Sequence, residues 1–140
     1  MLKLQHSIVK IITLNKRAQN SFAEVWIEKG ILYFIYAAIE TLSLSTAKNL
    51  IKLRLSIQNN SDYPVLCDLR NVIQADKKAM DYLAKEGSIQ TTAVALLVNY
   101  PHSKSTAQFY LSTSIPNVPT QVFENKLKAL DFLSHHPKRL

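Results

Sequence analysis

The chain lacks most of the features that mark a catalytic or metal-binding protein. Its 140 residues include only two glycines, Gly30 and Gly87, and a single cysteine, Cys67. Glycines this sparse exclude a glycine-rich phosphate loop, and one cysteine excludes an intramolecular disulfide. The four histidines show no spacing typical of a zinc site, and there is no nucleophile elbow or kinase motif. We therefore expect a protein that is not an enzyme and that carries no metal or cofactor.

A long apolar segment is also missing. Roughly 20 consecutive apolar residues are needed to span a bilayer, and no stretch approaches that length. The apolar residues of segment 1–14 are interrupted by Lys3, Gln5, His6 and Lys10, which does not fit a secretory signal. The single cysteine suits a reducing compartment. We therefore expect a cytoplasmic protein without an integral membrane segment.

Positive charge is concentrated at the two ends of the chain. The formal net charge is +7, yet residues 1–22 contribute four bases and residues 135–140 two, with no acid in either segment. This leaves residues 23–134 with a net charge of only +1. A nucleic-acid-binding domain is expected to carry its charge on a folded face. Solvated basic ends are therefore favoured over weak, salt-dependent binding to nucleic acid or anionic membrane, and no specific nucleic-acid partner is expected.

Residues 63–87 show the unit from which the fold is built. An apolar strand over residues 63–69 ends at the charged pair Asp68 and Arg70. A helix is then expected to begin at Asp76, a favourable N-cap residue, and to be stopped by Gly87. Strand and helix together predict one repeat of an α/β domain.

Further strands and helices are expected on both sides of this unit. They are a hairpin of strands 22–27 and 31–36, a helix from 44 to 57 capped by Ser43 or Ser45, a strand over 92–98, a helix over 103–112 capped by Ser103, a strand over 120–123 and a helix over 125–134. Such alternation predicts a single α/β domain with a mostly parallel sheet.

The two ends lie outside this domain. Residues 1–21 are expected to form an N-terminal arm, followed by the domain at 22–134 and a polar tail at 135–140. Within the arm, residues 7–14 fit a strand because they are rich in β-branched side chains, but they also fit one helical face. We favour the strand, which would extend the chain's own sheet or a neighbour's, and expect a loop over residues 15–21.

The order of these elements resembles the STAS/SpoIIAA-like superfamily, and in particular one bacterial branch of uncharacterised STAS-like proteins. The resemblance rests on Asp68-Leu69-Arg70-Asn71-Val72 closing a strand and on Asp76 opening a helix eight residues later. Further matching segments are 25–32, 63–71, 78–84, 92–98 and 116–123, so the resemblance spans roughly residues 22–134.

The resemblance implies a non-catalytic regulatory module that binds a protein partner and forms a homodimer. In members that antagonise anti-sigma factors, a serine at the start of the helix is phosphorylated. Here the matching positions hold Lys77 and Lys78, and Ala79 replaces the usual glycine. The phosphorylation switch is therefore not expected in this chain. Other members bind lipids, nucleotides or sensory ligands, which leaves a ligand-binding module as the alternative.

Several polar residues are expected to meet at the carboxyl edge of the sheet, where parallel α/β sheets bind ligands. Together with the two lysines that open the helix, the candidates for a ligand or partner site are Asp68, Arg70, Asn71, Lys77, Lys78, Tyr100, His102 and Ser103. The backbone amides that follow Ser103 are candidates to hold an anion. A small anionic or lipid ligand would bind at this edge or in an apolar cavity under the helices. The alternative favoured by the residue types is a structural Asp68–Arg70 ion pair with a solvated His102.

Two further features have a structural and a functional interpretation. Cys67 lies within a strand, where a buried and inert thiol is favoured over a nucleophile, since the adjacent Asp68 carboxylate raises a thiol pKa. Aromatic residues cluster on the hairpin, with Trp26, Tyr33 and Tyr36 among them. They are either part of the core or an exposed patch that marks an interface, and the sequence does not decide between the two.

Overall fold

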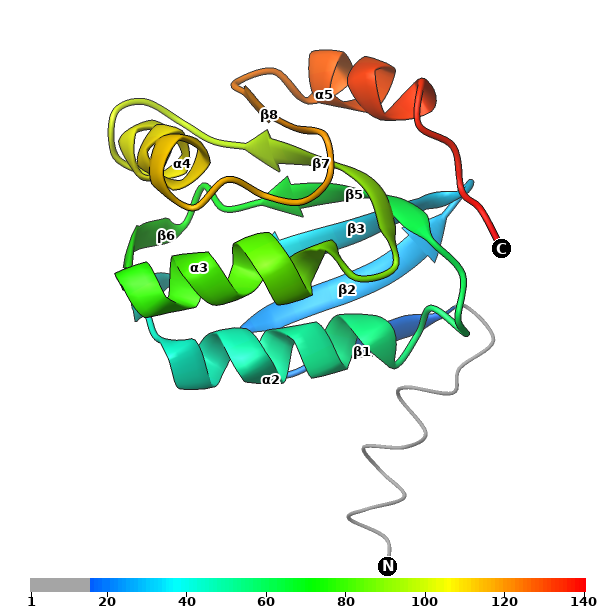
Figure 1. Cartoon of the computed structure of the whole chain (residues 1–140), viewed down its shortest axis with the longest axis horizontal. Coiled ribbons are helices and arrows are strands. Elements are labelled where there is room, and N and C mark those ends of the chain that lie inside the picture. The colour runs from blue at the N-terminus through cyan, green and yellow to red at the C-terminus, as the bar shows by residue number, and fades with distance from the viewer. Residues whose placement is uncertain (1–15) are drawn as a thin grey trace, which may run out of the picture.

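The computed structural model describes residues 16–140. The predicted strand at 7–14 lies outside the described residues. A sheet of six strands runs through the middle of the molecule in the order β1-β2-β3-β5-β7-β8 (Figure 1). Its strands are β1 (Arg17–Gln19), β2 (Ala23–Glu28), β3 (Ile31–Tyr36), β5 (Tyr63–Asp68), β7 (Thr91–Leu97) and β8 (Thr120–Phe123). The first three strands are antiparallel and β3, β5, β7 and β8 are parallel, so the predicted mostly parallel α/β sheet is confirmed.

Four helices cover the two faces of this sheet unequally. They are α2 (Leu44–Leu55), α3 (Lys77–Lys85), α4 (His102–Thr113) and α5 (Lys126–Ser134). Successive strand residues point to opposite faces: Val65 packs in the cluster with α2 and α3, whereas Leu66 packs against Ala129 and Leu133 of α5. Hence, in the part of the chain that the structure describes, α2, α3 and α4 form one layer and α5 covers the other face (Figure 1).

Local sequence explains where several elements begin and turn. Lys29 and Gly30 have φ angles of 51° and 78°, the left-handed values that a tight hairpin turn requires. The Ser43 hydroxyl accepts a hydrogen bond from the Thr46 amide at 3.2 Å, so Ser43 is the N-cap of α2. Asn125 caps α5 by accepting from the Lys128 amide at 3.0 Å. These short-range signals place the hairpin and both helices where the sequence predicts them.

Three short strands were not expected. β1 lies in the predicted loop 15–21. Its Ala18 is buried between two exposed residues, but a segment of three residues is too short for this alternation to indicate a strand. A second sheet pairs β4 (Ile39–Leu42) with β6 (Val72–Ala75) in parallel. Their pairing joins segments distant in sequence, and few of their side chains are buried, so neither has a strand pattern of its own.

The expected helix ends need two corrections. α4 begins at His102, one residue before the predicted Ser103 cap, because the Ser103 hydroxyl turns back to Asn99 and does not cap the helix. Gly87 does not stop α3 with a left-handed residue. The helix ends at Lys85 and tightens into a 3₁₀ turn, η1 (Glu86–Ser88), that contains the glycine.

The polar tail is attached to the domain. The amide of Asp62 donates to the Arg139 carbonyl at 2.6 Å, and the Arg139 amide returns a bond to the Asp62 carbonyl at 2.8 Å. The Thr92 hydroxyl donates to the His136 carbonyl at 2.6 Å. The tail therefore holds the amino ends of β5 and β7 together, where a solvated end was expected.

Removal of residues 137–140 should lower the free energy of unfolding by about 1–3 kcal/mol, because two backbone hydrogen bonds with Asp62 are lost. Urea denaturation should show a lower midpoint with an unchanged m-value. Removal of Leu140 alone, which is 98% exposed, is the matched control and should leave the midpoint in place. Equal midpoints for both truncations would contradict the role of the tail.

Candidate functional site

The predicted Asp68–Arg70 pair is present and serves the turn after β5. The Arg70 guanidinium donates to both carboxylate oxygens of Asp68, at 3.0 Å from Nε and 2.7 Å from Nη2, and the Arg70 amide donates to Oδ1 at 3.1 Å. These hydrogen bonds raise the pKa of Arg70. Asp68 is buried, and its acceptor sites are occupied by one neighbouring residue. The geometry is that of a structural ion pair that fixes a turn.

The start of α4 is likewise satisfied within the chain. The buried Ser103 hydroxyl accepts from the Asn99 amide at 2.9 Å and donates to the Asn99 side chain at 2.9 Å. The amides of Lys104 and Ser105 donate to the carbonyls of Asn99 and Pro101. These amides are therefore not free to hold an anion, although sequence reasoning made them candidates.

The remaining predicted residues lie at the surface. Tyr100, His102 and Asn71 are exposed, and the Asn71 carbonyl accepts from the Ile39 amide at 3.1 Å. Lys78 is also exposed. The structure thus places these residues around the carboxyl end of the sheet without joining their side chains into one site.

Lys77 takes part in a small polar cluster that joins α3 to the end of α4. It forms an ion pair with Asp81 and lies 3.4 Å from the Ser114 hydroxyl, which itself donates to Asp81 at 2.9 Å. The hydrogen bond from Lys77, followed by that from Ser114, lowers the pKa of Asp81. This cluster links two helices across the helical layer.

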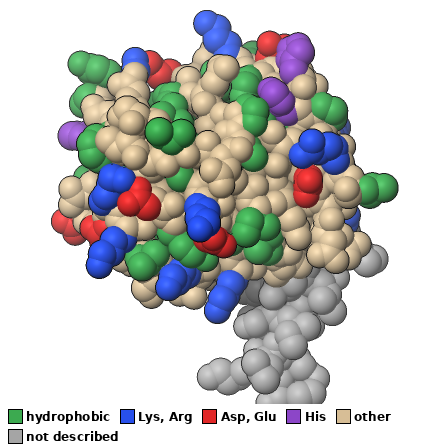
Figure 2. Space-filling model, viewed as in Figure 1, with side chains coloured by type: hydrophobic (Ala, Val, Ile, Leu, Met, Phe, Trp, Pro, Cys, Tyr) green, Lys and Arg blue, Asp and Glu red, His purple; other side chains and the backbone are tan. Residues whose placement is uncertain are grey.

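The charged groups on the face shown in Figure 2 do not point to a polyanion site. On the face shown in Figure 2, basic and acidic side chains are interspersed around α2 and α3. A single-sign patch is the usual footprint of nucleic-acid binding, and the view shows none on the part of the chain that the structure describes.

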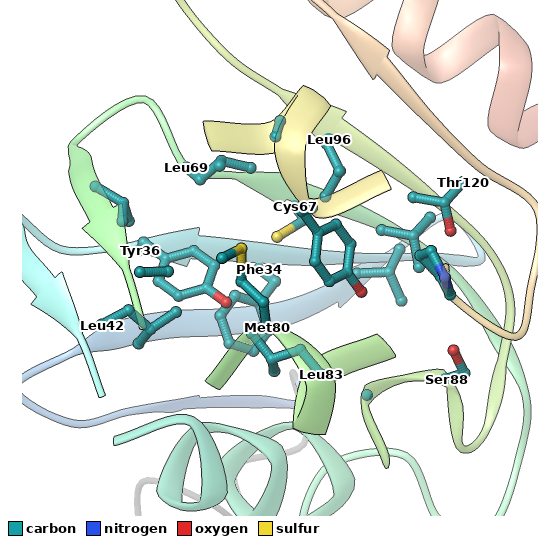
Figure 3. Close-up of a pocket in the computed structure, with 18 of the residues that line it drawn as sticks. Phe34, Tyr36, Leu42, Cys67, Leu69, Met80, Leu83, Ser88, Leu96 and Thr120 are labelled. Atoms are coloured by element: carbon teal, nitrogen blue, oxygen red, sulfur yellow. The ribbon is translucent and has the colours of Figure 1, made fainter. Parts of the chain in front are cut away.

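An apolar cavity of about 100 Å³ lies between the sheet and the layer of α2, α3 and α4. In Figure 3, Ser88 and Thr120 lie at one end and Tyr36, Leu42 and Leu69 at the other. The cavity therefore runs along the strands, from their amino ends toward the carboxyl edge.

Strand register explains why the cavity is continuous. Val65, Val94 and Thr120 are aligned across β5, β7 and β8 and form its first row. Phe34, Cys67 and Leu96 are aligned in the next row, two residues further on. Residues two apart on a strand share a face. Both rows therefore lie on the face of the sheet that the helices cover, and they form the mainly apolar sheet side of the cavity.

Among residues 16–140, one charged side chain lines this cavity. Arg54 of α2 is only 2% exposed, and its guanidinium donates to the side-chain oxygen of Gln58 and to the carbonyls of Gly87, at 3.3 Å, and Ile89, at 2.9 Å. All three acceptors are neutral. Burial lowers the pKa of Arg54 to about 10, which leaves the group charged at neutral pH.

The acidic groups around the cavity stay neutral. Burial, followed by the neighbouring Asp68 carboxylate, raises the pKa of the Cys67 thiol to about 12. Burial also raises the pKa of Tyr36 and that of Tyr110. Since these groups remain protonated at neutral pH, the Arg54 guanidinium gives the cavity its positive charge.

A loop closes one side of the cavity. Residues 114–119 connect α4 to β8, and Pro116 lines the cavity. The Asn117 amide donates to the Ala84 carbonyl of α3 at 3.1 Å and approaches the Ser88 hydroxyl at 3.3 Å. Together with Ser114 on Asp81, these bonds hold the loop against α3.

A different feature occupies the opposite face of the sheet. Trp26 and Tyr33 stack there with ring centroids 5.1 Å apart, Arg17 lies 4.8 Å above the Trp26 ring and Lys126 lies 5.7 Å from that of Tyr33. Both aromatic rings are half-buried, because α5 packs over β5, β7 and β8 and not over β1 and β2. Tyr36, by contrast, is buried in the core.

Comparisons with known proteins place the chain in a family. The model of the family described as Domain of unknown function (DUF7793) matches residues 25–137, and the chain belongs to this family. Among solved structures, it is similar to an uncharacterised protein of the DUF3478 family with a SpoIIAA-like fold from Shewanella loihica PV-4. The TM-score is 0.54 at 14% identity, over 83% of this chain and 98% of that one. No curated protein matches the chain.

These findings confirm the predicted SpoIIAA-like fold and do not show a function. Within residues 16–140, no helix is long and apolar enough to cross a membrane. The same residues contain no group of three or more histidine, cysteine or acidic side chains placed to hold a metal ion.

Sequence reasoning missed Arg54, and one signal pointed to it. Ala47, Leu50 and Ile51 form the buried face of α2, and Arg54 continues that face at a spacing of three and four residues. An arginine on the apolar face of a helix is seldom fully buried without a specific partner. The arginine on this otherwise apolar face of α2 was therefore the signal in the sequence that pointed to the cavity.

Cys67 should react very slowly with a thiol reagent such as DTNB in the folded protein. A pKa raised from 9.0 to about 12 lowers the thiolate fraction at pH 8 by about 1,000-fold relative to the unfolded chain. The labelling rate should rise with pH and become fast in urea. Rapid stoichiometric labelling of the folded protein at pH 8 would contradict this, and Cys67→Ala provides the blank.

Proposed function

We propose that this protein is a non-catalytic binding module that takes a small, largely apolar molecule into the cavity between the sheet and helices α2, α3 and α4. The observation that supports it most is the cavity itself, with its two rows of apolar strand residues. A bound apolar molecule would bury its surface against these side chains and gain dispersion contacts with them.

The position of the cavity walls supports a regulatory role, which we propose as part of this function. Its walls include α3 and the loop 114–119, and both also form the outer surface. A ligand in the cavity would change the preferred position of α3 and the loop. A protein partner in the cytoplasm would then bind one of these positions more tightly than the other. The family resemblance supports partner binding of this kind, without the serine switch, since Lys77 and Lys78 stand at the start of α3.

A second candidate function, self-association, is favoured by the Trp26–Tyr33 face. Aromatic residues and arginine are enriched at interfaces, and this face combines Arg17 and Lys126 with the acids Glu24 and Glu28. A twofold interface places the same patch of two copies face to face, and a patch that carries both signs avoids repulsion between like charges there. We therefore propose a second copy of this chain as its occupant.

Small neutral apolar probes, such as 1-hexanol, 1-octanol and toluene, should raise the melting temperature of the protein by several degrees at saturation. Val94→Phe fills the first row of the cavity and should abolish the shift. Leu127→Phe, at a position on α5 that is 77% exposed, is the matched control and should keep it. An unchanged melting temperature with every probe would rule out the cavity as a binding site.

Trp26→Ala should weaken self-association at least about tenfold, since a central aromatic residue carries much of the energy of an interface. Sedimentation velocity over a concentration series measures this directly. Phe109→Ala, at a position on α4 that is 51% exposed, is the control and should leave the dimer unchanged. A wild-type chain that sediments as a monomer at every concentration would exclude a homodimer.

A further inference from the structure

We infer that the molecule bound in the cavity is a monocarboxylic acid with an apolar chain, and that Arg54 binds its carboxylate. This inference rests on the proposed function and narrows its ligand class. Arg54 lies in the wall of this cavity. Its side chain lines a cavity whose other lining is mainly aliphatic and aromatic, and it is 2% exposed to solvent.

The charge of Arg54 is not balanced by an acidic side chain of the described residues. The ion pairs among residues 16–140 involve Arg17, Arg70, Lys77, Lys104 and Arg139, and none of them includes Arg54. Buried charges in proteins are normally paired with an opposite charge. A cation that faces a cavity without such a partner therefore calls for an anion within the cavity.

The Arg54 guanidinium has more hydrogen-bond donors than its three neutral acceptors use. A guanidinium has five N–H donors, and three hydrogen bonds are made here, to Gln58, Gly87 and Ile89. These neutral acceptors hold the group in place. The donors that remain suit a carboxylate, which guanidinium groups bind with short, charge-assisted hydrogen bonds.

The lining of the cavity favours a ligand with a single negative charge. Cys67, Tyr36 and Tyr110 line the cavity as neutral thiol and phenol groups, so none of them offsets Arg54. One buried cation balances one carboxylate, whereas a phosphate would bring additional charge into an apolar site. The rest of the ligand meets side chains such as Val65 and Leu96, which favour a hydrocarbon chain over a polar one.

Isothermal titration of the full chain with octanoate, 1-octanol and octyl phosphate tests the inference without any substitution. Octanoate should bind about tenfold more tightly than 1-octanol, because it adds charge-assisted hydrogen bonds to the same apolar contacts. Octyl phosphate should bind more weakly than octanoate. Hexanoate and decanoate then report the chain length that the cavity prefers.

Substitutions of single arginines test which residue causes the preference for octanoate over 1-octanol. Arg54→Met should remove the difference between octanoate and 1-octanol, and Arg54→Lys should keep part of it. Arg70→Gln, which removes the exposed arginine of the sheet edge, is the matched control and should retain the full difference. If Arg54→Met does not fold, the comparison of ligands on the unaltered protein still decides the matter.

The outcomes separate this inference from the proposed function. Equal affinity for octanoate and 1-octanol would overturn the carboxylate site and leave an apolar binding module. No binding of either molecule would overturn both. Tighter binding of octyl phosphate, or loss of the preference in Arg70→Gln, would overturn the assignment to Arg54.

Discussion

The helical layer depends on the buried polar network around Arg54 and Gln58. Arg54 holds the end of α2 against the carbonyls of Gly87 and Ile89, which lead from α3 into β7. Gln58, fully buried, donates to the carbonyls of Ser61 and Gln90 at 3.0 and 2.8 Å. Buried backbone carbonyls must be satisfied, so these two side chains join α2, α3 and the sheet where backbone pairing is absent.

This network also sets the character of the cavity. It anchors the helices at the amino end of the sheet, while the polar cluster of Lys77, Asp81 and Ser114 joins α3 to α4 from outside. The space between these two attachments is lined mainly by apolar residues of the strands and of the helices above them. The same sheet separates this cavity from the Trp26–Tyr33 face, so ligand binding and self-association, as proposed, would use opposite sides of one scaffold.

The candidate site could be predicted only in part. The expected ion pair of Asp68 and Arg70 was found, but the structure shows that it closes a turn, and Ser103 likewise serves its own loop. Their residue types suggested chemistry because polar groups at a sheet edge often bind ligands. Whether such groups are free depends on local hydrogen bonds, which composition and spacing do not reveal. An apolar cavity under the helices, by contrast, was among the predictions. The residues that line it, Arg54 included, were not.

The sequence by itself determined the alternation of strands and helices, the hairpin at Gly30 and the start of the helix after Ser43 or Ser45, because periodicity and capping act over a few residues. Only the tertiary structure decided the pairing of β4 with β6, the strand β1, the attachment of the tail and the place of Arg54. Each of these depends on groups brought together from distant segments. Such contacts leave no periodic trace in the chain, since their energy comes from partners that only the fold supplies.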